Sequence, residues 1–238
     1  MVDVGVLYRF RVKPEDDQKT EQIMREIFDA MAAEEFPTGD VKSYALFRDP
    51  STLGKWVLFE HFTEAGARNH AIGPLIQDPG KRHQELLIEP AERIELAPVI
   101  VHGCGEKISG TPMQGSRPDD KRPPAGVVFE FRVAPENDLK VEGVMRRIFD
   151  VMAEDEYSTG DVITYTLYRD PGDVGHWYMF EYFTAAGSEN HATGEKIYGP
   201  GMEQQRMLTE PHKRDLLDPV IVKGCGEPIA STSATKPA

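Results

Sequence analysis

The sequence is poor in cysteine, in basic charge and in long apolar runs. Two cysteines among 238 residues exclude a framework of several disulfides, so the fold does not require an oxidising compartment. Lys and Arg number 27 against 40 Asp and Glu, and the net charge of -13 repels phosphate backbones and anionic lipid surfaces. No stretch approaches the roughly 20 apolar residues of a membrane span. We therefore expect neither a nucleic-acid partner nor a membrane partner.

Sequence signatures of cofactor and metal sites are also missing. No strand is followed by a GxGxxG fingerprint, and there is no Walker sequence. No HxH, HxxxH or CxxC spacing occurs, so the pattern predicts no metal and no tightly held cofactor. The first residues lack a basic segment followed by an apolar core, which makes a cytoplasmic location the default expectation.

Most of the chain is present twice. Residues 5–108 align with residues 126–229 at a constant offset of 121 (126 minus 5), without insertion or deletion. IMREIFDAMA returns as VMRRIFDVMA, and PVIVHGCGE returns as PVIVKGCGE. Each copy has about 100 residues, a normal size for a compact domain. We predict the following division: a first domain at 1–106, a proline-rich linker at 107–125, a second domain at 126–229 and a frayed tail at 230–238.

Each copy predicts the element order β-α-β-β-α-β and hence an α+β, ferredoxin-like domain. The apolar face of the first strand comprises Val6, Tyr8, Phe10 and Val12, and its other face comprises Leu7, Arg9 and Arg11. The helix that follows carries an apolar stripe, Ile23, Met24, Ile27, Phe28 and Met31, which we expect to cover the apolar face.

The later elements of each copy are marked by turn and cap residues. Thr63 and Thr184 are predicted N-caps of a second helix, with further helical pieces around 81–88 and 202–209. The last strands contain Pro98 and Pro219, which favour an edge of the sheet over its centre. Each sheet then has one face covered by helices and a second, more polar face that needs a partner or water.

Several motifs recur in both copies and carry a family resemblance. YRF is followed by YxLFRDP and then by WxxFExFT and NHA. The matching residues are Tyr8, Tyr44, Arg48, Asp49, Pro50, Glu60, Phe62, Thr63, Asn69 and His70, with Phe129, Tyr165, Arg169, Asp170, Pro171, Glu181, Phe183, Thr184, Asn190 and His191 in the second copy. This pattern resembles the antibiotic biosynthesis monooxygenase family of small dimeric α+β barrels.

The resemblance implies that the two ferredoxin-like domains pair sheet to sheet as an intramolecular dimeric α+β barrel. The covalent link makes that pairing independent of concentration. Further pairing of whole chains into a homodimer is compatible with it. The resemblance also implies a small aromatic or hydrophobic molecule as the partner. Haem chemistry is disfavoured, because the first strands, LYRFRV and VFEFRV, lack the Asn that haem-degrading relatives use.

Glu60 and Glu181 are the sharpest candidates for catalysis. Each lies mid-strand among apolar side chains, where an unpaired carboxylate is costly to bury. One interpretation is an acid or base of raised pKa inside the barrel that takes a proton from a phenolic substrate. The alternative is a structural ion pair with Arg9, Arg11 or Arg132, or hydrogen bonds from backbone amides at the start of the second helix.

His70 and His191 are the only histidines that recur at one place in both copies. Such a His can orient a substrate hydroxyl or move a proton near neutral pH. It can equally cap the second helix or pack it against the sheet. The other five histidines, His61, His83, His102, His176 and His212, occur in one copy only, which argues against a symmetric metal site.

Aromatic and basic side chains supply the candidates for substrate binding. By strand alternation Tyr44 shares a face with Arg48, as Tyr165 does with Arg169, and such a pair either contacts an aromatic ligand or finishes the rim of a barrel. The remaining candidates are Arg9, Arg132, Trp56 and Trp177. Trp56 and Trp177 share a face with the glutamates and either shape an apolar pocket or belong to the core.

The two cysteines, Cys104 and Cys225, occupy the same place in each copy. A pseudo-twofold axis would allow them to meet, and a small residue in a Gly-Cys-Gly turn is the plainer interpretation. Elsewhere the copies differ: Arg9 aligns with Glu130, and Lys55 aligns with His176. We therefore expect the two pockets to differ.

The leading hypothesis from the sequence is a cofactor-independent monooxygenase that oxidises an electron-rich aromatic, such as a quinol or a polyketide-type phenol. The first alternative is a non-catalytic barrel that binds a small hydrophobic ligand. The second is an isomerase or cyclase on the same scaffold.

Overall fold

The structure, a computed structural model, describes residues 3–70, 73–106, 108, 125–157, 162–184, 187, 191, 195–227 and 229. Most of the predicted linker, the predicted tail and most of the predicted second helix of the second copy lie outside the described residues. Within them, no helix has the length and apolar character needed to cross a membrane.

The described elements follow the predicted order in both copies. The first copy contains β1 (Asp3–Arg11), α1 (Asp17–Glu34), β2 (Val41–Arg48), β3 (Lys55–Thr63), α2 (Glu64–His70), α3 (Pro74–Gln84) and β4 (Glu92–His102). The second copy contains β5 (Ala125–Arg132), α4 (Asp138–Asp155), β6 (Val162–Arg169), β7 (His176–Phe183), α6 (Glu195–Gln205) and β8 (Lys213–Lys223). Short 3-10 turns at Pro14–Asp16, Phe36–Thr38 and Pro135–Asn137 flank the long helices.

The long helices α1 and α4 lie where the sequence predicts them, whereas α3 and α6 begin several residues earlier than predicted. The predicted apolar stripe of α1 is buried at Ile23, Met24, Ile27 and Met31. The hydroxyls of Thr63 and Thr184 accept hydrogen bonds from the backbone N–H groups of Gly66 and Gly187, as expected of N-caps. The helical piece predicted from residue 81 instead starts at Pro74 and contains Pro79, because packing against α1 overrides the weak local propensity.

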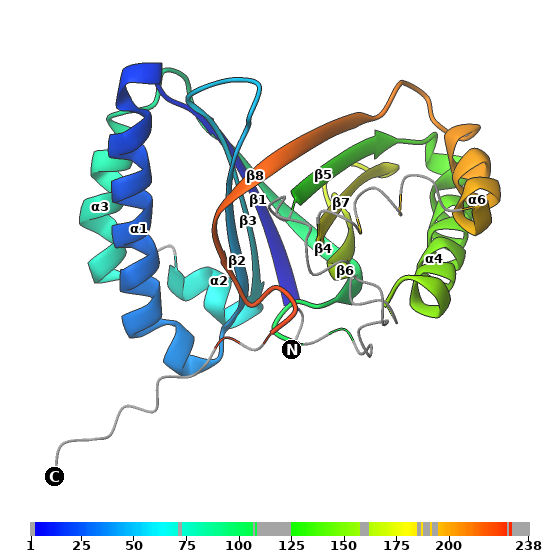
Figure 1. Cartoon of the computed structure of the whole chain (residues 1–238), viewed down its shortest axis with the longest axis horizontal. Helices are drawn as coiled ribbons and strands as arrows, with labels where there is room; N and C mark the ends of the chain where they lie inside the picture. Colours follow the sequence, from blue (N-terminus) through cyan, green and yellow to red (C-terminus); the bar gives the residue numbers. More distant parts are fainter. Residues whose placement is uncertain are drawn as a thin grey trace, which may run out of the picture.

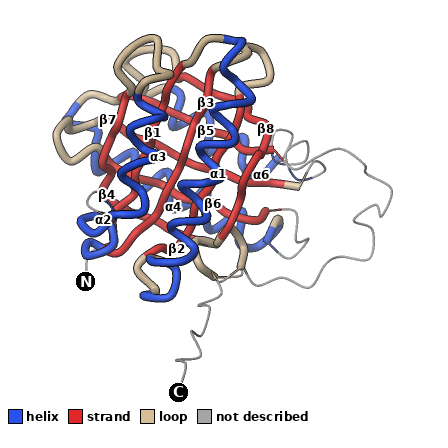
Figure 2. Tube along the Cα trace, turned by 90° about the vertical axis from the view of Figure 1, so that its left-hand side faces the viewer, coloured by secondary structure: helices blue, strands red, loops and turns tan. Residues whose placement is uncertain are grey.

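The eight strands close into one barrel in the order β1-β3-β2-β8-β5-β7-β6-β4. Each copy supplies a four-stranded antiparallel sheet, and the seams are the pairs β2–β8 and β4–β6. Helices α1 and α3 cover the outer face of the first sheet, and α4 and α6 cover the second (Figure 1). Figure 2 shows α1 and α3 in front of the crossing strands of the two sheets. This arrangement confirms the predicted intramolecular dimeric α+β barrel.

The last strands, β4 and β8, are edge strands of their own copies' sheets, as predicted, and barrel closure pairs each of them with the other copy. β4 pairs with β1 on one side and with β6 on the other, and β8 pairs in the same way with β5 and β2. The sheet accommodates Pro98 and Pro219 because the register of each seam shifts next to the proline. A proline that donates no hydrogen bond is tolerated at such an irregularity.

The centre of the barrel is aromatic, which corrects the expectation of a polar inner face. Phe59 and Phe180, equivalent residues of the two copies, stack across the interior with ring centroids 4.4 Å apart and planes 17° from parallel. Phe47 packs its ring against the backbone of Gly126, and Tyr168 packs against Gly5 in the same way. Each copy thus inserts an aromatic ring into a space that only a glycine of the other copy leaves open.

A cluster of charged groups on the inner face surrounds Glu130. Arg9 Nη1 lies 3.0 Å from Glu130 Oε2, so the two residues that the internal alignment places opposite each other form an ion pair. His176 Nε2 and Lys213 Nζ contact Glu130 Oε1 at 3.1 and 3.0 Å. The Glu130 side chain is only 8% exposed, and burial alone would raise its pKa. The three neighbouring basic groups outweigh this effect and hold the pKa of Glu130 below its ordinary value.

The two cysteines meet at the pseudo-twofold axis. Cys104 and Cys225 are partners in an isolated antiparallel bridge, and both are buried free thiols. The Gly105 N–H donates to the Gly224 carbonyl at 2.6 Å, and the Gly226 N–H donates to the Gly103 carbonyl at 2.7 Å. Both interpretations of the sequence therefore hold: the residues lie in Gly-Cys-Gly turns, and the axis brings these turns together.

Candidate functional site

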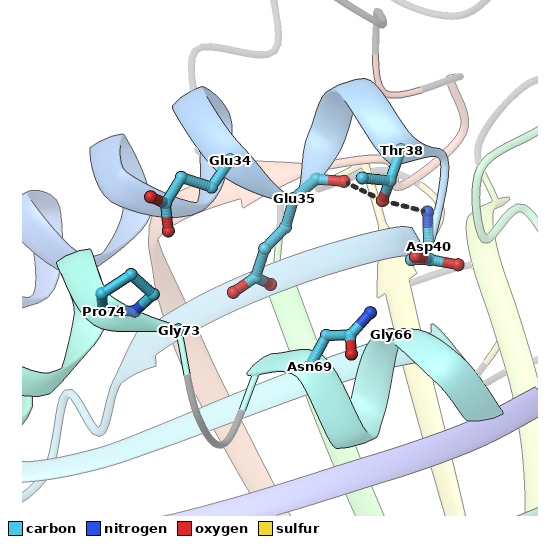
Figure 3. A pocket seen from close by; sticks show the side chains of 8 residues that line it. All are labelled: Glu34, Glu35, Thr38, Asp40, Gly66, Asn69, Gly73 and Pro74. Carbon is cyan, nitrogen blue, oxygen red and sulfur yellow. Dashed lines mark hydrogen bonds between the residues drawn. The ribbon is translucent and has the colours of Figure 1, made fainter.

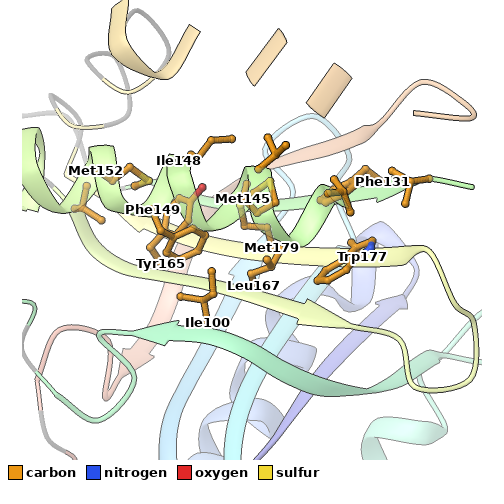
Figure 4. Packing of buried hydrophobic residues seen from close by; sticks show 14 of the residues in the cluster. Ile100, Phe131, Met145, Ile148, Phe149, Met152, Tyr165, Leu167, Trp177 and Met179 are labelled. Carbon is orange, nitrogen blue, oxygen red and sulfur yellow. The ribbon is translucent and has the colours of Figure 1, made fainter. Parts of the chain in front are cut away.

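Both glutamates lie on the helix-covered faces of the sheets, not inside the barrel. In β7, Glu181 alternates with the inward-facing Phe180 and shares its face with Trp177 and Met179, which pack under α4 (Figure 4). Glu60 occupies the same place in β3. Both residues are buried, Glu181 at 3% and Glu60 at 4% exposure. Two-residue periodicity thus corrects the expected position of the acid or base: it lies between sheet and helices.

A cavity of about 360 Å³ lies between the second sheet and helices α4 and α6. Its apolar lining comprises Phe129, Met145, Ile148, Met179 and Ile197. Its polar lining comprises Tyr165, Glu181, His191, Gln204, Gln205, His212 and Arg214. The volume is at the lower end of the range typical of small-molecule sites. Seven of the twelve lining residues are polar, but most of the lining surface is apolar, as is usual in such sites.

His191 lies between two carboxylates at the wall of this cavity. Its Nδ1 is 3.0 Å from Glu156 Oε2, and its Nε2 is 3.6 Å from Glu181 Oε1. The first copy repeats the arrangement at His70, whose Nδ1 is 3.0 Å from Glu35 Oε2 and whose Nε2 is 3.8 Å from Glu60 Oε1. The Glu156 contact fixes the ring and leaves Nε2 directed toward Glu181. Each copy therefore contains a Glu-His-Glu arrangement.

Glu35 is brought to His70 by the end of α1. The Thr38 hydroxyl donates to the Glu35 carbonyl at 2.7 Å and accepts from the Asp40 N–H at 3.2 Å, which closes the chain just after the helix. Figure 3 shows the Glu35 side chain directed from this turn toward the segment that holds Asn69 and Gly73. These residues border a separate cavity of about 270 Å³ on the first copy.

Burial and charge shift the pKa of both members of each His-Glu pair upward. Burial raises the pKa of Glu181, and the neighbouring charge of His191 offsets only part of that effect. Burial alone would lower the pKa of His191, but the hydrogen bond with Glu156 and the charge of Glu181 outweigh it and raise the pKa. A proton is thus retained between the two groups toward neutral pH, which suits general acid–base chemistry.

Tyr165 adds a third polar group to the same wall. It is buried, and it lies directly opposite Glu181 in the pairing of β6 with β7. Burial raises the pKa of Tyr165 well above its ordinary value of 10.0, so it acts as a neutral donor. Tyr44 occupies the equivalent place in the first copy, where its hydroxyl has no hydrogen-bond partner among the described residues.

The raised pKa of His191 predicts a pH-dependent contribution to stability. Its folded-state pKa exceeds the ordinary value of 6.5, so the stabilisation is fully present below pH 6.5 and is lost as the pH rises through the raised pKa. We expect His191→Gln to destabilise the protein more at pH 6 than at pH 9 in thermal unfolding measurements.

A histidine with the opposite shift supplies the control. Burial lowers the pKa of His83 to about 4, so the folded state resists protonation and loses stability as the pH falls below 6.5. His83→Gln introduces the residue that the second copy has at this place, Gln204. We expect this variant to gain stability relative to the wild type on going from pH 7 to pH 5. Parallel pH profiles for the two variants would contradict both assignments.

The other predicted site residues lie outside this cavity. Trp56 and Trp177 are fully buried beneath Arg48 and Arg169, whose guanidinium carbons each lie 4.4 Å from the indole centroid. Arg48 also contacts Asp17 of α1 at 2.9 Å, so the Trp-Arg set fastens the helix to the sheet. These contacts match the interpretation of the tryptophans as core.

The arginines of the first strands are engaged elsewhere. Arg9 pairs with Glu130 inside the barrel, and Arg132 lies 2.5 Å from Asp173 at the surface. Arg11 contacts Glu89. The expected ion pair between a first-strand arginine and Glu60 is therefore replaced by the contact with His70.

Sequence reasoning missed Glu35 and Glu156, although a signal was present. Both copies keep an acidic residue at this place, 35 plus 121 being 156, directly after the long helix. Among the described residues no cluster of His, Cys, Asp or Glu is arranged to hold a metal ion. The site of the second copy contains the pair His191 and Glu181, which can accept protons, at the wall of the cavity.

Two ferredoxin-like copies that close one eight-stranded barrel define a tandem, single-chain dimeric α+β barrel. A putative monooxygenase from Fusobacterium nucleatum has this architecture over 93% of this chain and 94% of its own, with a TM-score of 0.77 and 16% identity. A protein of the same description from Lactobacillus acidophilus matches over 95% and 98%, with a TM-score of 0.75 and 11% identity.

An anthrone oxidase-like protein matches over 95% of both chains, with a TM-score of 0.59 and 11% identity. At these identities the likenesses establish the fold, including its tandem arrangement over the full length. No family model and no curated protein matches the sequence.

Proposed function

We propose that the protein is a cofactor-independent monooxygenase that oxidises an electron-rich aromatic, a quinol or polyketide-type phenol, in the cavity of the second copy. The observation that carries the proposal is the buried Glu181 at the wall of a largely apolar cavity, with His191 3.6 Å away. A carboxylate of raised pKa in such surroundings is suited to remove a weakly acidic proton. The description of one similar structure as anthrone oxidase-like supports the same reaction class.

Proton removal is the step that the residues of the chain perform. Glu181 takes the proton of the substrate, and the Nε2–H of protonated His191 stabilises the resulting anion. The apolar part of the lining shields the electron-rich anion from solvent protons, so that it reacts with dioxygen. For a benzylic CH₂ that becomes a ketone, the substrate supplies all four electrons. One oxygen atom enters the product and the other leaves as water, and no further reductant is needed.

Oxygen consumption tests the proposal. Purified protein is mixed with a panel of anthrones and quinols in an oxygen-electrode cell, and products formed under ¹⁸O₂ are analysed by mass spectrometry. We expect uptake above the uncatalysed rate and one labelled oxygen atom in the product. Absence of such uptake across the panel would overturn the proposal. Binding without uptake would assign the barrel to ligand binding, and conversion without uptake would assign it to isomerisation or cyclisation.

A further inference from the structure

The cavity of the second copy contains an arginine whose counterpart in the first copy is neutralised. Arg214 lies in β8 directly opposite Phe129 of β5, and both line the cavity. The equivalent Arg93 of β4 has its Nη1 2.5 Å from Glu95 Oε1. At the place of Glu95 the second copy has Leu216, 95 plus 121 being 216, which is 51% exposed. One substitution between the copies therefore removes the internal carboxylate.

Among the described residues, no carboxylate lies within ion-pair distance of the Arg214 guanidinium. The positive charge of Arg214 nevertheless acts on the Glu-His pair, because it works to lower the pKa values of both Glu181 and His191. A guanidinium that lines a cavity and has no ion-pair contact among the described residues is available to an anion supplied by a ligand, and its planar fork matches a carboxylate with two parallel hydrogen bonds.

A flat aromatic surface lies beside this arginine. The His212 ring stacks on Phe129 with centroids 4.4 Å apart and planes 30° from parallel. The first copy has Ala91 in place of His212, so it lacks this stack. Burial and the nearby charge of Arg214 lower the pKa of His212, which is therefore neutral at pH 7. Arg214 thus supplies a positive charge at this side of the cavity, and the Phe129–His212 stack is a neutral aromatic surface next to it.

We propose that Arg214 binds a carboxylate substituent of the aromatic ligand, whose ring system packs on the Phe129–His212 stack. The ligand class is therefore an aromatic carboxylate, and it binds to the second copy only, since Glu95 already occupies the equivalent arginine of the first copy. The assignment of the cavity as a substrate site rests on the proposed function, whereas carboxylate recognition is measurable by binding alone.

A matched pair of probes tests carboxylate recognition. 2-Naphthoate and the neutral 2-naphthamide are titrated into the full-length protein by isothermal titration calorimetry. We expect the wild type to bind naphthoate about 10- to 100-fold more tightly, the range expected for a charge-assisted hydrogen-bonded pair. Equal affinity for the two probes, or no measurable binding of either, would overturn the proposal.

Three variants localise the effect. Arg214→Gln is expected to remove the preference for naphthoate while naphthamide affinity stays the same. Arg93→Gln, the same change at the equivalent place of the first copy, should leave both affinities unchanged. Leu216→Glu supplies the second copy with the carboxylate that Arg93 has, and should lower naphthoate affinity without touching the arginine. It therefore provides an independent readout if Arg214→Gln does not fold.

The outcomes separate this proposal from the proposed reaction. A preference that survives in both Arg214→Gln and Leu216→Glu contradicts carboxylate binding at Arg214, whatever the oxygen uptake. Oxygen uptake that fails while the preference follows the expected pattern contradicts the monooxygenase assignment and leaves the anion site in place.

Discussion

Glu181→Gln is expected to lower oxygen uptake by about 10²- to 10⁴-fold, the usual contribution of a positioned general base. The amide has the size of the carboxylate but accepts no proton from the substrate. Since burial already disfavours the charge of Glu181, its removal leaves no large stability defect to confuse the result. Initial rates with the best anthrone or quinol of the panel measure the effect.

Glu60→Gln is the matched control, because it makes the same change in the same setting of the first copy. If the cavity of the second copy performs the reaction, Glu60→Gln retains nearly the full rate. If both copies react, each single variant keeps about half of the rate and only the double variant is inactive. Unchanged uptake in Glu181→Gln would remove Glu181 from the mechanism, and unchanged affinity of that variant for the neutral naphthamide would show that the cavity is intact.

Gly126→Ala is expected to destabilise the protein by about 1–3 kcal/mol, the usual cost of an added methyl group in a packed core. A Cβ at this position would lie 2.4 Å from Phe47 Cε1, where no real contact exists. The Phe47 ring has little room to retreat, because the rings of Phe180 and Tyr182 lie 5.6 and 6.0 Å from it. Urea unfolding of the wild type and the variant measures the difference.

The control for this prediction has the opposite expected sign. Gly143 is exposed in α4, and a Cβ there would meet nothing within 4 Å. Gly143→Ala should stabilise the protein by about 0.5–1 kcal/mol, since alanine is the better helix former. Adding Phe47→Leu to Gly126→Ala should recover part of the lost stability. Equal unfolding midpoints for Gly126→Ala and the wild type would show that the two copies do not interlock at this point.

Local periodicity made most of the fold predictable. The alternation in β1 and the apolar stripe of α1 depend only on neighbouring residues, and the offset of 121 extends each assignment to the second copy. The inner face was harder to identify, because β3 is apolar on both sides: Trp56 faces the helices and Phe59 faces the barrel. The seams between β2 and β8 and between β4 and β6 join distant segments, which no local pattern specifies.

The site was predictable to a smaller extent. The duplication selected His70 and His191 from seven histidines and marked the buried glutamates, and the structure places them together. The partner of each histidine lies just beyond a helix, where the backbone turn decides its direction, so composition alone did not reveal it. The sequence alone did not mark Arg214 as a site residue. The contact between Arg93 and Glu95 in the first copy shows that the strand of Arg214 lacks the equivalent carboxylate.

The Arg9–Glu130 contact bears on the history of the chain. These residues occupy equivalent places, so a symmetric pair of first copies would set arginine against arginine, and a pair of second copies would set glutamate against glutamate. At this position each copy complements the charge of the other, and pairing of two identical copies would place like charges in contact. Fusion also released the two sites from the identity that symmetry imposes, which is the condition under which one copy can specialise while the other serves as its scaffold.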